Sequence, residues 1–221
     1  MLLTIENLTF GWQNKVLFQN INCQLEAGEI ILLRGENGSG KTTLLKLIAG
    51  MIPHFSRGKI LKGDILLNDH SIIENPPKFF FPLVAFIPSQ NIDFFLLNEN
   101  LEQEIALIQA VFKISSSEIE RKKGELHELL PGTRELWSKN FDRMTSFQKV
   151  LSLLSIYYFQ ETRLFLIDEI LDFISHENLS FWLNFFQVQS QTGCGIIFVS
   201  HQPAEYPFRG WEIENKTLLR G

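Results

Sequence analysis

Residues 35–42 read Gly35-Glu36-Asn37-Gly38-Ser39-Gly40-Lys41-Thr42 and match the pattern G-x-x-x-x-G-K-[ST]. A short apolar run, Glu29–Arg34, precedes the pattern, and a stretch of helical period that ends near Gly50 follows it. Glycines let the backbone turn so that successive N–H groups point at phosphate oxygens, and a helix start adds partial positive charge there. The sequence therefore predicts a strand, a phosphate-binding loop and a helix in succession, rather than a chance glycine-rich turn.

This loop predicts how a nucleotide is held. Lys41 is placed to reach the β- and γ-phosphates, Thr42 offers a hydroxyl to Mg²⁺, and Thr43 follows at the α-phosphate. The other expected contacts come from the turn itself, at Gly35, Asn37, Gly38, Ser39 and Gly40. The predicted ligand is a nucleotide triphosphate with Mg²⁺.

An acidic pair, Asp168-Glu169, follows the apolar run Leu164–Ile167. A buried strand delivers both carboxylates to its C-terminal end, where ligands bind in open α/β sheets. We expect Asp168 to hold Mg²⁺, directly or through water, and Glu169 to polarise an attacking water as a general base. The pair alone is a weak signal, but it becomes strong in a chain that also carries the phosphate loop.

Two further polar residues end apolar runs. Gln90 ends the run VAFIPSQ, where a neutral amide can contact Mg²⁺ or the attacking water and sense whether a γ-phosphate is present. His201 follows the run FVS and is expected to contact a γ-phosphate or to order the water. A structural histidine is the alternative for His201.

Composition limits the function classes. The chain has 221 residues, with 20 Lys+Arg against 25 Asp+Glu and a net charge of −5, which argues against a sequence-independent nucleic-acid binder. No apolar run approaches the roughly 18–20 residues of a membrane helix, and the start MLLTIENLTF lacks the basic region of a signal peptide. The two cysteines, Cys23 and Cys194, fit no metal spacing and favour a reduced, cytosolic setting.

The remaining patterns predict alternating strands and helices. Further strands are expected at Leu2–Glu6, Ile21–Leu25, Gly63–Asn68, Phe79–Ile87 and Gly195–Ser200, and a closing hairpin at Trp211–Leu219. Helices are expected at Asn98–Phe112, Ser117–Leu130, Ser146–Phe159 and Leu179–Val188, with the charges of the second forming a solvated face. These elements predict an α/β fold with a mostly parallel sheet and a helical insert between about residues 91 and 160.

Taken in order, the phosphate loop, Gln90, the acidic pair and His201 resemble the ATP-binding subunits of the ABC superfamily, over nearly the whole chain. The resemblance implies one domain over residues 1–221: a P-loop NTPase core lobe with N-terminal antiparallel strands (1–90 and 161–221) and a helical lobe (91–160). It implies ATP and Mg²⁺ as ligands, transport-coupled ATP hydrolysis, a second ATPase subunit, and a polytopic membrane subunit that docks near Gln90. Trp12 falls where this family carries an aromatic residue that stacks on adenine, with a core tryptophan near an edge strand as the alternative.

A closer likeness is to the ATPases of energy-coupling-factor importers. Three segments carry it: Ile52–Phe55, Gly63–Leu67 and Asn100–Ala106. This likeness implies uptake of a vitamin or a metal ion, and a cytoplasmic location, peripheral on the inner face of the cell membrane.

The family's signature LSGGQ is altered here. Its usual place, 24 residues before Asp168, reads Met144-Thr145-Ser146-Phe147-Gln148, in which a hydroxyl and the glutamine are kept and both glycines are lost. The family's signature covers ATP held by the partner subunit, so the ring of Phe147 is expected to obstruct that approach or force a different loop path. The following segment Asp172–Ser175 is also altered, with Ile170 replacing the usual proline. We therefore expect a heterodimer with unequal sites, in which this chain's own phosphate loop remains competent.

Phenylalanine accounts for 20 of the 221 residues. Six of these lie between residues 79 and 95, namely Phe79, Phe80, Phe81, Phe86, Phe94 and Phe95. Most are expected in the core, with Phe94 and Phe95 forming part of the docking surface for the membrane subunit.

Three other functions stay open. The chain could be an ATP-binding structural or regulatory half with little hydrolysis of its own. A small P-loop kinase is disfavoured because the middle of the chain has Arg121 and Arg134 but no arginine cluster. An ABC protein that acts on nucleic acid or ribosomes is disfavoured by the acidic balance, so no nucleic-acid partner is expected.

Overall fold

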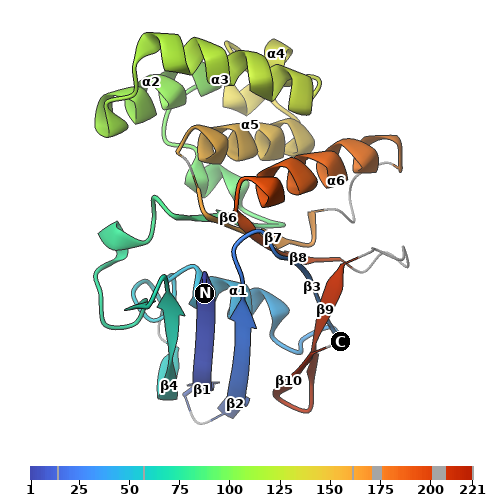
Figure 1. Ribbon diagram of the computed structural model, residues 1–221. Coiled ribbons are helices and arrows are strands. Elements are labelled where there is room, and N and C mark those ends of the chain that lie inside the picture. Colours follow the sequence, from blue (N-terminus) through green and yellow to red (C-terminus); the bar gives the residue numbers. More distant parts are fainter. Residues whose placement is uncertain (14, 57, 161, 171–175, 201–207, 221) are drawn as a thin grey trace.

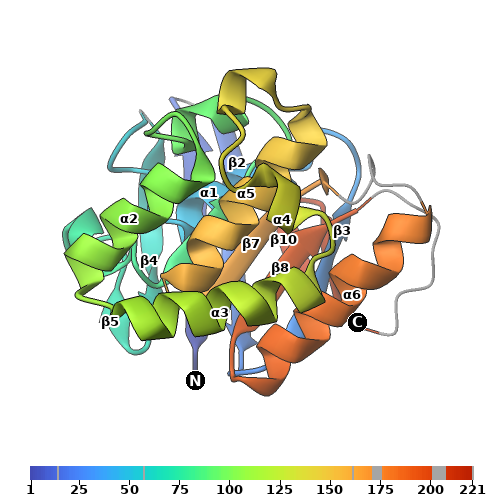
Figure 2. The same ribbon diagram turned by 90° about the horizontal axis from the view of Figure 1, so that it is seen from above.

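The computed structural model (Figures 1 and 2) describes residues 1–221 apart from 14, 57, 161, 171–175, 201–207 and 221. In this part of the chain the strands form two sheets. The first is antiparallel, in the order β2-β1-β4-β5. It consists of β1 (Leu3–Trp12), β2 (Lys15–Leu25), β4 (Lys59–Leu67) and β5 (His70–Ser71). Because β1 and β2 are joined by a tight hairpin, Trp12 pairs with Lys15 at its tip.

The second sheet is mostly parallel and has the order β10-β9-β3-β8-β7-β6 among the described residues. Its strands are β3 (Ile30–Gly35), β6 (Val84–Ile87), β7 (Leu164–Asp168), β8 (Gly195–Val199), β9 (Arg209–Glu214) and β10 (Thr217–Arg220). Every residue of β7 and β8 is buried, as expected for parallel strands covered on both faces. Since β3, β8 and β7 run parallel, the phosphate loop after β3 and the acidic pair after β7 emerge at the same edge. The predicted α/β fold is confirmed.

The helices divide into an inner and an outer group. They are α1 (Lys41–Ile48), α2 (Leu101–Phe112), α3 (Ser116–Leu129), α4 (Thr133–Leu136), α5 (Ser146–Phe159) and α6 (His176–Gln191), with 3-10 turns η1 (Pro77–Phe79), η2 (Ile92–Phe95) and η3 (Phe141–Arg143). Helix α1 packs its leucines against apolar side chains of both sheets. Figure 1 shows α2, α3 and α4 outermost, and Figure 2 shows α5 lying over β7 between α2 and α6.

Local sequence signals explain where the outer helices begin. The Asn100 side chain accepts a hydrogen bond from the Gln103 N–H at 3.0 Å and caps α2, and Ser115 caps α3 in the same way. The solvated face expected for α3 is only partly right, because Lys122 is buried. The expected start of the third helix at Ser146 coincides with the start of α5.

The expected strand Phe79–Ile87 is wrong in its first half. Residues 77–79 form the turn η1, and the strand β6 begins only at Val84. Pro82 explains the late start, because proline has no N–H to donate to a strand ladder. Phe79 and Phe81 are consequently exposed, while Phe80 is buried.

Membrane-spanning helices and a disulfide are both absent from the described residues. None of their helices has the length and apolar character needed to cross a membrane. Cys23 and Cys194 are both buried and form no disulfide there.

Candidate nucleotide site

The phosphate loop has a backbone that only glycine accommodates at two of its turns. Gly40 has a φ of +106°, and a Cβ placed on it would lie 2.7 Å from the ring of Phe18. Gly35 has a φ of +146°, and its Cβ would lie 2.7 Å from the Ser39 hydroxyl oxygen. Both positions combine a left-handed backbone with a close approach, so the glycines of the motif are required for the shape of the loop.

Lys41 lies inside this loop and is only 5% exposed. Its ammonium donates to the carbonyl oxygens of Gly35 at 2.8 Å and Glu36 at 3.1 Å. The Ser39 hydroxyl is buried and has no hydrogen-bond partner among the described residues. A buried cation beside an unsatisfied hydroxyl fits an incoming phosphate oxygen, which accepts hydrogen bonds from both.

Thr42 and Asp168 meet across the site. The Thr42 hydroxyl donates to both carboxylate oxygens of Asp168, at 2.9 and 3.0 Å, and the Ser89 hydroxyl reaches the same carboxylate at 3.5 Å. These side chains come from α1, from the end of β7 and from the loop after β6. Hydroxyl and carboxylate oxygens are the donors that Mg²⁺ prefers, so this set fits a magnesium ion.

Asp168 is 2% exposed, and this burial raises the pKa of its carboxyl above the ordinary value. The hydrogen bonds from Thr42 and Ser89 lower the pKa, whereas the neighbouring Glu169 charge raises it further. A buried carboxylate of this kind gains from a nearby cation, which offsets the unfavourable desolvation of its charge.

Glu169 lies next in the chain with a φ of +56°, a conformation that residues other than glycine adopt infrequently. It is half-buried and lines a pocket of about 330 Å³. Residues 37, 38 and 40–43 of the loop and α1 line this pocket as well. A carboxylic residue that combines this uncommon backbone conformation with a place in a pocket beside a phosphate-binding loop is typical of functional sites.

Trp12 lines the same pocket from the tip of the first hairpin. It is partly exposed, and its ring stands edge-on to Phe10 with 5.2 Å between the centroids. This location is compatible with the expected adenine contact, and the stacking itself stays a prediction. Lys15 and Leu17 also line the pocket, although nothing in the sequence analysis singled them out. Lys15 lies opposite Trp12 in the hairpin, and this pairing was the available signal for Lys15 alone.

Two other residues expected at the site are Gln90 and His201. Gln90 is exposed and does not line this pocket; its neighbour Ser89, which the sequence analysis overlooked, makes the contact with Asp168 instead. The hydroxyl at the end of the run VAFIPSQ was the signal that could have identified Ser89. His201 and the segment 172–175 lie outside the described residues.

The altered signature forms the start of α5. The Thr145 hydroxyl accepts from the Gln148 N–H at 3.3 Å, and the Gln148 side chain accepts from the Thr145 N–H at 3.1 Å and from the Lys139 ammonium at 2.8 Å. This reciprocal pair is a capping box. Ser146 is exposed, whereas Phe147 is half-buried and packs against the apolar core beneath the helices, as does the buried Met144.

An apolar groove of about 440 Å³ lies beside η2 and α2. Phe94, which is 82% exposed, lines it together with Phe95, Leu97 and Val111. The expectation that most phenylalanines between residues 79 and 95 are core is wrong. The buried members are Phe80 and Phe86, Phe95 is half-buried, and Phe79, Phe81 and Phe94 are exposed.

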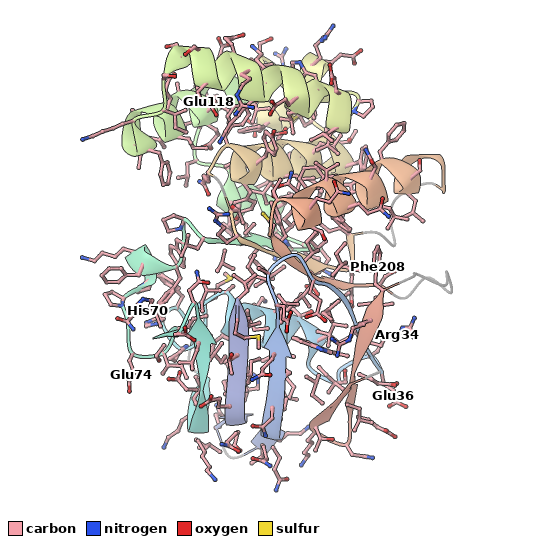
Figure 3. The ribbon with its side chains drawn as sticks, viewed as in Figure 1. Arg34, Glu36, His70, Glu74, Glu118 and Phe208 are labelled. Atoms are coloured by element: carbon pink, nitrogen blue, oxygen red, sulfur yellow. The ribbon has the colours of Figure 1, made fainter. Side chains whose placement is uncertain are left out.

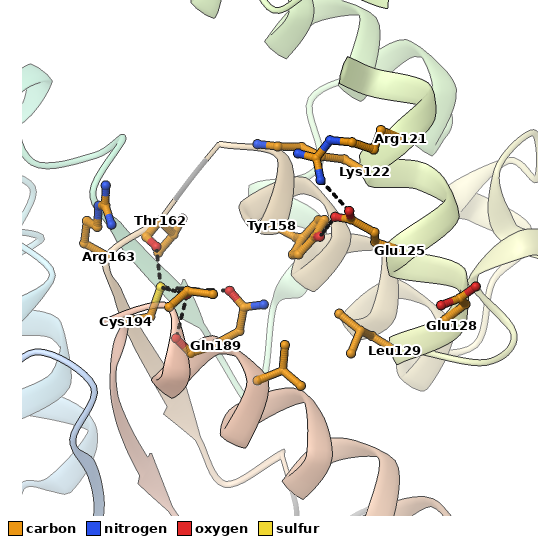
Figure 4. Close-up of a pocket in the computed structure, with 12 residues that line it drawn as sticks. Arg121, Lys122, Glu125, Glu128, Leu129, Tyr158, Thr162, Arg163, Gln189 and Cys194 are labelled. Atoms are coloured by element: carbon orange, nitrogen blue, oxygen red, sulfur yellow. Dashed lines mark hydrogen bonds and ion pairs between the residues drawn. The ribbon is translucent and has the colours of Figure 1, made fainter. Parts of the chain in front are cut away.

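A larger cavity of about 650 Å³ lies between α3, the end of α5 and the end of α6 (Figure 4). Its polar groups largely satisfy one another: Arg121 pairs with Glu125, and the Tyr158 hydroxyl donates to Glu125 at 3.0 Å. The buried Cys194 thiol donates to the Thr162 carbonyl at 3.0 Å, and burial raises its pKa, which makes it a poor nucleophile.

This cavity shares no lining residue with the nucleotide pocket. Figure 3 shows the same separation, with Glu36 of the phosphate loop in the sheet-containing half and Glu118 of α3 in the outer helical layer.

Comparison with known proteins places these features in a family. The chain matches the ABC transporter family over residues 18–172. It is 32% identical over 201 residues to the cytochrome c biogenesis ATP-binding export protein CcmA of Reclinomonas americana, covering 90% of this chain and 83% of that protein. It is 23% identical over 202 residues to the energy-coupling factor transporter ATP-binding protein EcfA1 of Thermotoga maritima, covering 91% and 73%.

Two solved structures share the fold. One is an ATP-binding subunit of an ABC transporter, with a TM-score of 0.85, 22% identity, and coverage of 100% of this chain and 90% of that one. The other is cbiO1 from Clostridium perfringens, part of the transporter complex cbiONQ, with a TM-score of 0.81, 19% identity, and coverage of 100% and 88%.

Proposed function

This chain belongs to the ABC transporter family and is a transport ATPase, and we propose that it powers an importer of the energy-coupling-factor type as one half of an asymmetric ATPase dimer. The likeness to EcfA1 and to cbiO1 supports this transporter type, together with the segments Ile52–Phe55, Gly63–Leu67 and Asn100–Ala106. A second candidate is a subunit of an export system, which the higher identity to CcmA favours. The single observation that carries ATP hydrolysis is the contact of Thr42 with Asp168 beside the buried Lys41.

Binding begins at the phosphate loop. Lys41 exchanges its two loop carbonyls for phosphate oxygens, and the Ser39 hydroxyl and the N–H groups at the start of α1 donate to other oxygens. Thr42 and Asp168 hold Mg²⁺, which when bound neutralises charge on the phosphates. Trp12 stacks on the adenine at the far end of the nucleotide.

Hydrolysis depends on the second carboxylate. Glu169 lines the pocket and accepts a proton from the attacking water as a general base. In this proposal, Gln90 contacts Mg²⁺ or the attacking water and senses the γ-phosphate. His201 contacts the γ-phosphate or orders the water. Gln90 has to approach from its exposed position for this role, which requires the loop after β6 to move.

Asymmetry arises at the signature. This chain's nucleotide is covered by the signature of a second ATPase subunit, whereas Met144–Gln148 of this chain face the partner's nucleotide. Phe147 occupies a position where the family has glycine. The side chain there hinders the close approach of the signature backbone to the partner's nucleotide. We therefore propose that ATP on this chain is hydrolysed and that ATP on the partner turns over poorly.

The apolar groove is the proposed docking surface for a polytopic membrane subunit. Phe94 is almost fully exposed, which is unusual for a phenylalanine, and Leu97 and Val111 extend the apolar surface beside it. Docking there holds the chain peripherally on the inner face of the cell membrane. ATP-driven closure of the dimer moves the membrane subunit through differential affinity for the open and closed states.

The test is purification of the tagged chain from membranes, followed by identification of its partners. We expect a polytopic membrane protein and a second ATPase to co-purify. A single-chain homodimer with no membrane protein would contradict the proposal, and membrane partners of an export system would favour the second candidate.

A substitution tests the docking surface. Phe94→Ser, alone and together with Phe95→Ser, is expected to weaken co-purification of the membrane subunit roughly ten-fold while ATP binding is kept, since exposed aromatic anchors dominate interface energies. Phe79→Ser is the matched control, because Phe79 is an exposed phenylalanine that does not line the groove. Equal loss in the control, or no loss in the groove variants, would place the docking surface elsewhere.

A further inference from the structure

One ion pair joins the segment after Gln90 to the altered signature. The Lys149 ammonium lies 2.5 Å from a carboxylate oxygen of Asp93. Lys149 directly follows the signature residue Gln148 in the first turn of α5, and Asp93 lies in η2 beside Phe94. The two residues are therefore close in space although they are distant in sequence.

The exposures of the two partners are unequal. The Lys149 side chain is 15% exposed and that of Asp93 is 69% exposed. Most of the Lys149 side chain is covered by protein, and among the described residues its ammonium pairs with the Asp93 carboxylate. The exposed carboxylate is screened by water, so the pair adds little to folding stability. It joins η2 to the first turn of α5 at one defined point, beside the apolar cluster to which Ile92, Val150 and Leu151 belong.

Two lysine side chains make polar contacts at the signature segment or at the residue directly after it. Lys139 donates to the Gln148 side chain, which itself caps the Thr145 N–H. One residue later, Lys149 ties the same helical turn to Asp93. A segment seated in the apolar groove contacts Phe94 and Phe95, and these flank the other end of this tie.

We propose that the Asp93–Lys149 pair transmits docking at the groove to the signature, so that an occupied groove sets the position of Met144–Gln148 over the partner's nucleotide. Asp93 and Lys149 act here as positioning residues and touch no nucleotide. The inference rests on the proposed function, because it requires a membrane subunit at the groove. An apolar contact permits sliding between η2 and α5, whereas a charge pair fixes one register between them.

Single substitutions remove the tie without altering the shape of either side chain greatly. In the complex with the membrane subunit and the second ATPase, this chain carries Glu169→Gln so that the remaining turnover reports the partner's nucleotide. Against that background, Asp93→Asn and Lys149→Met are each expected to lower membrane-stimulated ATP turnover about five-fold. The KM for ATP and the turnover without the membrane subunit are expected to stay unchanged. The charge-swapped pair, Asp93→Lys with Lys149→Asp, is expected to restore most of the stimulation.

A matched ion pair in the sheet-containing half provides the control. Arg209 contacts Glu29 at 2.6 Å, and their exposures, 58% and 16%, resemble those of Asp93 and Lys149. Arg209→Gln is expected to leave the stimulation unchanged. Stimulation equal to wild type in both single variants, equal loss in Arg209→Gln, or no rescue by the charge swap would each overturn the proposal.

A second measurement uses the chain alone and does not need the membrane subunit. Hydrogen exchange of the backbone amides at residues 144–148 is expected to quicken in Asp93→Asn and Lys149→Met and to stay unchanged in Arg209→Gln. Unchanged exchange in the first two variants would overturn the tie itself. A wild-type chain that binds no ATP or recruits no membrane subunit would instead contradict the proposed function, so the two failures are distinguishable.

Discussion

Helices α1 and α5 both begin at a functional motif, but their first turns are built in opposite ways. The N-cap of α1 is Gly40, which makes no side-chain capping bond, so the N–H groups of the first turn remain available to a ligand. The first turn of α5 is closed by a capping box between Thr145 and Gln148. The N-terminus of α1 therefore has backbone N–H groups available for a phosphate, whereas the N-terminus of α5 uses its own side chains to cap and stabilise the helix.

The side chains around the two helix starts show the same contrast. Near α1, a buried lysine and an unsatisfied serine hydroxyl surround the loop. Near α5, Lys139 is already bonded to Gln148, and Phe147 packs into the core. The first motif is organised for binding and the second for packing, which is the physical basis of the proposed asymmetry.

The largest expected effect tests whether the α1 side is catalytic. Glu169→Gln removes the proposed general base and is expected to slow ATP turnover roughly 10²- to 10⁴-fold while ATP binding is kept. Turnover and nucleotide affinity are measured on the same complex. Glu36→Gln, at an exposed acid of the phosphate loop, is the control and should retain activity. Full activity of Glu169→Gln would exclude Glu169 as the base.

The next effect tests binding at α1. Lys41→Met removes charge-assisted hydrogen bonds to the phosphates, which contribute about 1.5–3 kcal/mol each, and is expected to weaken nucleotide affinity about 100-fold. Equilibrium binding of a labelled ATP analogue measures the change. Lys62→Met, at an exposed lysine of β4, should bind as the wild type does. Equal affinity of Lys41→Met and wild type would place the nucleotide elsewhere.

The smallest effect tests the α5 side. Ser146→Gly with Phe147→Gly restores the family's glycines and is expected to raise turnover of the complex several-fold, if the partner's site is limited by this signature. Each glycine costs about 0.5–1 kcal/mol of helix stability, so Tm is measured in parallel. Ser116→Gly in the first turn of α3 reports that cost without touching the signature. Unchanged or lower turnover in a variant that remains folded would show that Phe147 does not limit the site.

The sequence predicted the strand, loop and helix around the phosphate-binding motif from local patterns. The glycine pattern and the apolar run before Asp168 are local signals with strict spacing, and the structure brings Thr42 and Asp168 together as the motif requires. The start of α5 at Ser146 also followed from local pattern, because Thr145 and Gln148 form a capping box within a few residues.

Features that depend on tertiary packing were missed. Ser89 approaches Asp168 only because β6 and β7 are neighbours in the sheet, and the chain order alone does not show this. The exposure of Phe79 and Phe81 follows from a turn set by prolines, whereas their apolar character predicted a strand. Lys122 is buried although it lies in a highly charged helix, because helical period decides which side of α3 meets its neighbours.

The most direct test of the unequal sites is ATP turnover by the purified chain, measured alone and then with its second ATPase subunit and membrane subunit. We expect weak turnover alone, since two copies of this chain would face each other with the altered signature, and a marked rise when the correct partner supplies a normal one. Robust turnover by a homodimer of this chain would contradict the proposed asymmetry.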